Sequence, residues 1–367
     1  MTAEIGLWSH KSDFKIIHLL HLSRYPLKRG EAKIKYCVSV NVCHGRQNSV
    51  YNFDMKQCVS LFFSGIFFSL LMVPLLAAPE TGAAIKTQKE KLIGQLPAGT
   101  LKILDKPYVE GAKPGSNAAS LQILDLYVPA GNGPFPLIVW IHGGGWHGGD
   151  KESSGASLAL QFIPRGFALA SLDYRYTYDA PFPAQVEDCN AALVWLRANA
   201  KEYHLNPDRV GVVGHSAGAH LAALMAVTGG EHPFSKALNA SLRVQAAVCW
   251  AAPFDLDRER GNWPTNMFAW NPKDPFSRTF FPGGAYDGDF ARKASPASYI
   301  HAGIPPMLIV HGARDTTVPL GQASVFAAKL KESGVDVTFR VDPDHGHDVM
   351  GASATEEAIQ FFERTLR

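Results

Sequence analysis

The sequence lacks a marked excess of either charge. Its 367 residues contain 35 Lys and Arg against 33 Asp and Glu, which gives a formal net charge of +2 at pH 7. Nucleic-acid-binding domains concentrate basic residues on their folded part, whereas eight of the basic residues here lie in residues 1–54. We therefore expect no nucleic-acid partner. Because 46% of the residues are hydrophobic, the chain can build one large core.

Cysteine is also scarce. Of the five cysteines, only Cys189 and Cys249 follow residue 58, and each lies in an apolar pattern. Two cysteines far apart exclude a disulfide scaffold, so we predict two buried thiols, with a single bridge between them as the alternative. The sequence has no metal-binding pattern either, because neither His142 nor His147 has a carboxylate or thiol at a recognised ligand spacing. We predict no metal and no cofactor.

One long hydrophobic run lies inside the chain. Residues 59–76 follow Met55 and Lys56 and precede small residues, which is the pattern of a secretory signal peptide. We predict that Met55 is the true initiator, that residues 1–54 are an upstream extension outside the folded structure, and that residues 55–78 are the signal peptide. We therefore predict that the protein is secreted or periplasmic. The alternative is a membrane anchor, because the run is at the short limit for a membrane span.

Beyond residue 78, apolar runs of strand length alternate with helical patterns. The runs are mostly continuous, which indicates strands covered on both faces, as in a parallel sheet. We predict a single α/β domain over residues 79–367, with a mostly parallel central sheet and helices on both faces. The predicted strands are residues 121–128, 136–141, 167–174, 209–213, 244–250, 306–310 and 335–341, and the predicted helices are residues 183–200, 216–227, 321–334 and 354–366.

Residues 252–295 break this alternation. The segment has no sustained period and is too long for a plain connection, which favours a lid-like insertion near the functional site. A packed excursion that covers no ligand is the alternative. Its bulky apolar residues are Trp263, Met267, Phe268, Trp270, Phe276, Phe280 and Phe281.

Two glycine-rich motifs follow predicted strands. The first, "HGGGWHGGDK", spans residues 142–151, and so many glycines indicate backbone that must bend sharply or approach another group closely. The second, "GHSAGAH", places Ser216 between a strand and a helix in the pattern G-x-S-x-G. In that context the pattern predicts a nucleophile elbow, in which the serine lies on a sharp strand-to-helix turn.

A serine hydroxyl is a weak nucleophile, so Ser216 needs a base and an acid that orients the base. Asp315 lies just past one predicted strand, and His345 and His347 lie just past the next. All these positions are at carboxyl ends of strands, where open α/β sheets place their chemistry. We predict a catalytic triad of Ser216, Asp315 and His347, with His345 as the competing base. Gly346 would let the loop bring His347 to Ser216.

The stretches "IHGGGWHGGDK", "LDYRY", "GHSAGAH", "HGARDTTVP" and "PDHGH" resemble the α/β-hydrolase serine esterases and lipases. The resemblance is strongest to the branch of carboxylesterases and feruloyl or acetyl-xylan esterase-like enzymes, and it covers residue 121 to the C-terminus. It implies an α/β-hydrolase fold and an oxyanion hole formed by the backbone N–H groups of Gly144, Gly145 and Ala217. The sequence departs from the family around His347, where the frequent G-x-G-H-G form is absent.

The resemblance implies hydrolysis of carboxylic esters through an acyl-enzyme, on small esters or on acyl groups of a polysaccharide. One alternative is an amide-cleaving hydrolase of the peptidase or formamidase kind, and another is a non-catalytic binding protein on the same fold. We expect no membrane partner unless the leader is uncleaved, and the sequence leaves the oligomeric state open. We interpret the nearby polar residues as structural: Asp150, Lys151, Asp173, Arg175, Asp188, His215 and His220.

Overall fold

The structure is a computed structural model. It describes residues 15–23, 35–44, 47–53, 90–112, 121–152, 154–229, 242–257 and 279–367. The chain divides into two units, Met1–Ala78 and Pro79–Arg367.

In the first unit the backbone forms an antiparallel sheet of β1 (Lys15–Ser23), β2 (Lys35–His44) and β3 (Gln47–Phe53). Residues 1–54 thus include regular strands. That they precede the true start of translation stays a prediction. The predicted signal peptide, residues 55–78, lies outside the described residues.

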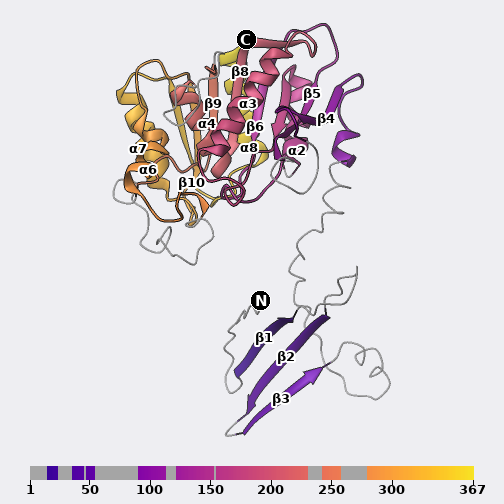
Figure 1. Ribbon diagram of the computed structural model, residues 1–367, viewed down its shortest axis with the longest axis vertical. Coiled ribbons are helices and arrows are strands. Elements are labelled where there is room, and N and C mark those ends of the chain that lie inside the picture. Colours follow the sequence, from indigo (N-terminus) through magenta and orange to yellow (C-terminus); the bar gives the residue numbers. More distant parts are fainter. Residues whose placement is uncertain are drawn as a thin grey trace. The chain divides into compact units, whose positions relative to one another are not determined.

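The second unit contains an eight-stranded sheet in the order β11-β10-β9-β8-β6-β7-β5-β4 (Figure 1). Pairing is parallel from β11 to β7, and β5 joins β7 and β4 in antiparallel pairs. The mostly parallel sheet of the prediction is therefore confirmed. The strands are β4 (Leu101–Pro107), β5 (Ile123–Val128), β6 (Phe135–Ile141), β7 (Ala168–Leu172), β8 (Leu205–His215), β9 (Ala246–Trp250), β10 (Met307–Gly312) and β11 (Val337–Asp342).

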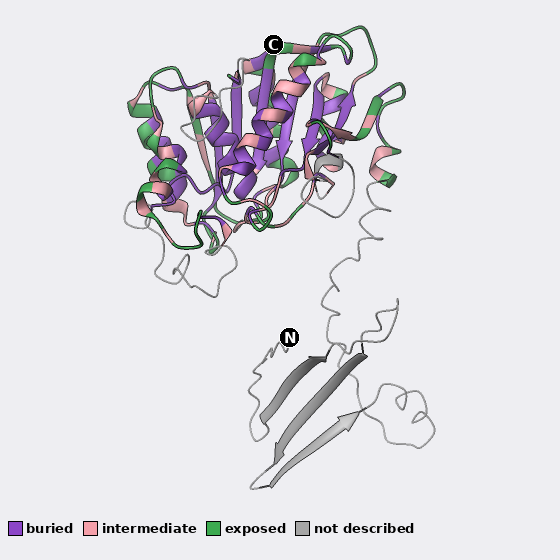
Figure 2. Ribbon diagram, viewed as in Figure 1, coloured by how far each residue is buried: buried purple, intermediate pink, exposed green. Residues whose placement is uncertain are grey.

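Helices cover both faces of this sheet, as predicted. Along β6, Leu137, Val139 and Ile141 belong to one hydrophobic cluster, while Ile138 and Trp140 belong to a second cluster on the other face. The first cluster contains residues of α3 (Ala184–Ala198), α4 (Ala217–Thr228), α6 (Gly288–Lys293) and α7 (Leu320–Glu332); the second contains residues of α2 (Gly155–Phe162) and α8 (Ala352–Leu366). Two short 3₁₀ helices complete this unit, Ile163–Arg165 and Pro296–Ser298. Burial on both faces explains why the central strands read as continuous apolar runs (Figure 2).

The sequence patterns did not predict β4 or α2. β4 is an edge strand whose side chains are mostly exposed, so it lacks the apolar run that marks the central strands. α2 has only eight residues, and no side chain at its N-cap closes its first turn. β4 is fixed by its pairing with β5, and α2 by its packing against β7 and α8, rather than by a local signal.

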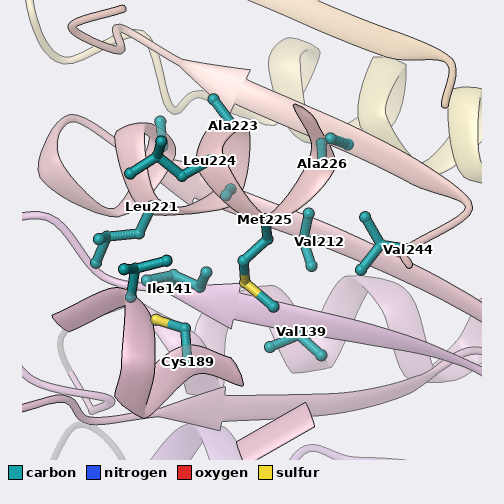
Figure 3. Packing of buried hydrophobic residues seen from close by; sticks show 14 of the residues in the cluster. Val139, Ile141, Cys189, Val212, Leu221, Ala223, Leu224, Met225, Ala226 and Val244 are labelled. Atoms are coloured by element: carbon teal, nitrogen blue, oxygen red, sulfur yellow. The ribbon is translucent and has the colours of Figure 1, made fainter. Parts of the chain in front are cut away.

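Helix α4 is buried on every side. Met225 points toward Val139 and Val212 of the sheet, and Leu221 and Leu224 belong to the same hydrophobic cluster (Figure 3). Because the helix is enclosed, its N-terminus is held rigidly at the carboxyl ends of β6 and β8. Ser216 lies at that N-terminus.

Cys189 of α3 and Cys249 of β9 are buried free thiols, which confirms the prediction. Burial raises the pKa of both thiols, so they stay protonated and behave as apolar core groups.

The two ends of the predicted insertion lie within the described residues. Phe280 and Phe281 are buried in the first cluster, and α6 follows them. Residues 258–278 lie outside the described part, and with them Trp263, Met267, Phe268, Trp270 and Phe276. The lid-like role of residues 252–295 therefore stays a prediction. Among the described residues, the helices are too short or too polar to cross a bilayer.

Candidate active site

Ser216 lies on the turn between β8 and α4. It has a left-handed φ of 53° with ψ of −120°, a conformation that residues other than glycine seldom adopt. Its N–H donates to the carbonyl oxygen of Trp250 at 2.8 Å, and its carbonyl accepts from the N–H of His220 at 3.0 Å. These bonds to β9 and to the first turn of α4 hold the strained turn in place.

The glycine that ends the elbow motif is required by close contact. A Cβ atom on Gly218 would lie 2.1 Å from the carbonyl oxygen of Ile141, so a side chain here would push α4 away from β6. The motif therefore serves packing as well as the turn. The glycine-rich loop lies directly against this turn: a Cβ atom on Gly143 would lie 3.0 Å from the carbonyl oxygen of His215 and 3.4 Å from the Cβ of Ser216.

The loops that follow β10 and β11 carry Asp315 and His347, and the backbone joins these loops. The N–H of Ala313 donates to the carbonyl of Asp342 at 2.7 Å, and the N–H of Arg314 donates to the carbonyl of His345 at 3.1 Å. Because the two loops are fixed to each other, the side chains of Asp315 and His347 meet above adjacent strand ends.

The structure brings Ser216, His347 and Asp315 into one chain of hydrogen bonds. Nδ1 of His347 is 2.8 Å from Oδ2 of Asp315, and Nε2 of His347 is 2.8 Å from Oγ of Ser216. An ionised carboxylate only accepts, so we assign the imidazole proton to Nδ1. Nε2 is then an acceptor for the Ser216 hydroxyl proton.

The carboxylate of Asp315 is buried, and several hydrogen-bond donors surround it. Its other oxygen, Oδ1, accepts from the N–H groups of Thr317 and Val318, both at 2.8 Å. Burial by itself would raise the pKa of Asp315. The hydrogen bonds from His311, His347 and the backbone at Val318 outweigh burial and hold this pKa well below its usual value. The carboxylate is therefore ionised at neutral pH.

Two histidines support this chain in ways that the sequence did not reveal. Nε2 of the buried His311 donates to the carbonyl of Val318 at 2.8 Å and lies 3.2 Å from Oδ2 of Asp315. Nε2 of His215 donates to the carbonyl of His347 at 2.8 Å, and burial lowers the pKa of His215 to about 4, so this ring is neutral. The only sequence signal for His311 is its place near the carboxyl end of a predicted strand, four residues before Asp315.

His345, the competing base of the sequence analysis, faces a different partner. Its Nδ1 is 2.8 Å from Oδ1 of Asp342, and its side chain is 49% exposed. The hydrogen bond to Asp342 raises the pKa of His345. The structure thus places His347, and not His345, against Ser216.

The glycine-rich loop is bent through several left-handed residues. Gly144 has a φ of +112°, and a Cβ atom there would lie 2.2 Å from the carbonyl oxygen of Gly148, so only glycine fits. Gly145 and Trp146 also have positive φ values, 61° and 60°. The carbonyl of Gly144 accepts from the N–H of His147 at 3.1 Å.

A buried lysine and its carboxylate partners hold the base of this loop. Nζ of Lys151 lies 2.7 Å from Asp105 and 3.2 Å from Asp125, and the N–H of Lys151 donates to Asp173 at 2.5 Å. Burial alone would lower the pKa of Lys151, but the three carboxylates raise it, so the ammonium stays charged. This matches the structural role expected for Lys151 and Asp173.

Arg175, Asp188 and His142 make contacts within the fold near this site. Arg175 makes a two-pronged ion pair with the buried Asp188, as expected for structural partners. The ring of His142 stacks on Tyr174 with centroids 4.3 Å apart. Within the described residues, no group of three His, Cys, Asp or Glu side chains is arranged to hold a metal ion.

A cavity of about 620 Å³ opens at the other end of α4, beside Thr228, Arg243 and His301. Ser216 directly precedes this helix whereas Thr228 ends it, so the cavity does not adjoin the hydrogen-bonded chain of Asp315, His347 and Ser216.

Comparisons with known proteins agree on fold and class. The BD-FAE family model matches residues 124–330. Esterase LipQ of Mycobacterium tuberculosis is 28% identical over 223 residues, which is 60% of this chain and 51% of LipQ. The chain spans about half the length of the first curated relatives that it matches.

Solved structures of esterases share the fold. A truncated carbohydrate esterase from gut microbiota superimposes with a TM-score of 0.63 at 23% identity, over 74% of this chain and 98% of that one. A propionate-bound esterase from Thermogutta terrifontis gives a TM-score of 0.57 at 24% identity, over 73% and 94% of the two chains. At these identities the likeness establishes the α/β-hydrolase fold.

Proposed function

This chain belongs to the BD-FAE family, and from that premise we propose that it is a serine hydrolase of carboxylic esters. The observation that carries the proposal is the unbroken chain from Asp315 through His347 to Ser216, with both links at 2.8 Å. The esterase names of its curated relatives support the same reaction class.

In the proposed mechanism Ser216 Oγ attacks the ester carbonyl carbon while its proton passes to Nε2 of His347. Asp315 holds the imidazole in the required tautomer and stabilises the positive charge that forms on it. The protonated His347 then gives this proton to the departing alcohol oxygen, which leaves an acyl group on Ser216. Water attacks the acyl-enzyme in the same way and releases the acid.

We assign the oxyanion hole to the N–H groups of Gly144, Gly145 and Ala217. Ala217 is the first residue of α4, so its N–H has no acceptor within the helix and lies beside the nucleophile. The glycine-rich loop lies against Ser216 at Gly143, one residue before Gly144. Donors held in place before the reaction stabilise the charge of the tetrahedral intermediate without reorganisation.

For the substrate we propose small esters or acyl groups linked to a polysaccharide. One structural neighbour is described as a carbohydrate esterase, which supports the second class.

A rate panel tests the reaction type: p-nitrophenyl esters of increasing acyl length, acetylated xylan, methyl ferulate and a peptide anilide. We expect every hydrolysed ester to give a higher kcat/KM than the anilide. Faster turnover of the anilide than of all esters would identify an amide hydrolase, and inertness to the whole panel would favour a binding protein.

We also propose that the protein is exported with residues 55–78 as its signal peptide. The apolar run after Lys56 and the small residues that follow it support this. Expression of the full reading frame should give a mature chain that begins between Ala77 and Ala84, as read by mass spectrometry. A mature product that retains residues before Met55 would contradict the proposal.

A further inference from the structure

The residue after the glycine turn is tied to the helix that carries Ser216. Trp146 follows Gly145 directly and is buried. Its indole Nε1–H donates to Nδ1 of His220 at 3.2 Å, and the two rings meet edge to face with centroids 5.1 Å apart. His220 lies one helical turn after Ser216, and its N–H donates to the carbonyl of Ser216.

The hydrogen bonds of His220 fix both its orientation and its protonation. An indole N–H only donates, so Nδ1 of His220 must be the acceptor. Nε2 lies 2.8 Å from the carbonyl oxygen of Ala294, which only accepts, so the proton is on Nε2. The neutral ring with this one tautomer satisfies both partners, and it is fully buried.

From this geometry we propose that Trp146 and His220 set the position of the oxyanion-hole loop relative to Ser216. The inference rests on the proposed function. His220 is a positioning residue, because it acts through Trp146 and does not touch the reacting atoms. The carbonyl of Trp146 also accepts from the N–H of Thr177 at 2.9 Å, so the loop is held at both its backbone and its indole.

The effect on rate follows from the distance dependence of the oxyanion hole. Its donors must lie about 2.7–3.1 Å from the developing negative oxygen, and losing one donor typically costs about 10²-fold or more in kcat. Gly145 and Trp146 are consecutive residues, so an indole that shifts after it loses the hydrogen bond to His220 also shifts the adjacent peptide. Both acylation and deacylation pass through an oxyanion, so we expect the loss in kcat and little change in KM.

The two nitrogens of His220 can be tested separately. In His220→Gln, the amide can still reach the carbonyl of Ala294 but no longer accepts from Trp146; in His220→Asn, the shorter amide can accept from Trp146 but loses Ala294. Trp146→Phe keeps the aromatic packing and removes the indole N–H. We expect His220→Gln and Trp146→Phe to lower kcat by about 10- to 100-fold with KM within about 3-fold, and His220→Asn to retain most of the activity.

Each rate is divided by the number of functional sites, counted by titration with a fluorophosphonate, so that misfolded protein does not enter the comparison. The double variant Trp146→Phe with His220→Gln should lose no more than about 3-fold beyond the worse single variant, because both changes break the same bond. Affinity for a trifluoromethyl ketone analogue should fall in proportion to kcat/KM.

Unchanged kcat per titrated site in Trp146→Phe and His220→Gln would overturn the inference, as would additive losses in the double variant. A role in packing alone would instead lower the melting temperature and the number of titrated sites while leaving kcat per site unchanged. Failure of the proposed function would be recognised separately in the unaltered protein, which would then cleave the anilide faster than every ester or leave the whole panel unhydrolysed, and this inference would fall with it.

Discussion

Ser216→Ala should lower kcat on the best p-nitrophenyl ester by about 10⁴-fold or more, because no acyl-enzyme can form without the hydroxyl oxygen. The residual rate should come from the oxyanion hole and from substrate binding, which the substitution leaves in place. The measurement is the steady-state rate of purified protein, corrected for the background hydrolysis of the ester.

The fold should survive this change, since alanine removes one oxygen from a partly buried side chain. Ser324→Ala on the exposed side of α7 is the matched control, and it should keep full activity. Melting curves of both variants should overlay that of the unaltered protein. Ser216→Ala with more than a tenth of the original kcat would remove Ser216 from the mechanism.

His347→Gln should lower kcat by about 10³-fold or more, and His345→Gln by less than about 3-fold. Glutamine can occupy the space of either ring but cannot take up the proton of Ser216. Of these two histidines, His347 contacts Oγ of Ser216, whereas His345 pairs with Asp342 at the surface. Steady-state kinetics of the two variants side by side gives the ranking.

The hydrogen bond from the His215 side chain to the backbone of His347 helps to separate a chemical effect from a displacement of the loop. It ends on the carbonyl of His347, so exchange of the His347 side chain leaves that hydrogen bond available. The loop should therefore keep its place, and a loss of rate would report on the imidazole. A larger loss in His345→Gln than in His347→Gln would reassign the base to His345.

The central strands and the turn at Ser216 were predictable because their signals are local. Continuous apolar runs mark β6 and β8 through β10, and the glycines around Ser216 mark the elbow. The edge strand β4 could not be predicted in this way, because its exposed residues carry no such pattern. The predicted strand at residues 209–213 is shorter than β8, which begins at Leu205. Leu205 pairs with Phe135 of β6, but the residues that follow it are polar and give no strand signal.

Contacts between segments far apart in the sequence could not be predicted from the sequence. The sequence predicts packing roles for His215 and His220, but their hydrogen bonds reach His347 and Ala294, which lie 132 and 74 residues further along the chain. The sequence gives no role for His311, because its place near the end of a predicted strand does not show that its side chain lies beside Asp315. Such partners are set by the order of the strands in the sheet, which no single segment encodes.

Covalent labelling of the unaltered protein by a fluorophosphonate, with the labelled residue located by peptide mass spectrometry, shows directly whether Ser216 is the nucleophile. The proposed mechanism predicts one label per chain, attached to Ser216, with activity lost in step with labelling. Labelling of a different residue in step with inactivation, or full ester hydrolysis by protein that resists the reagent, would contradict it.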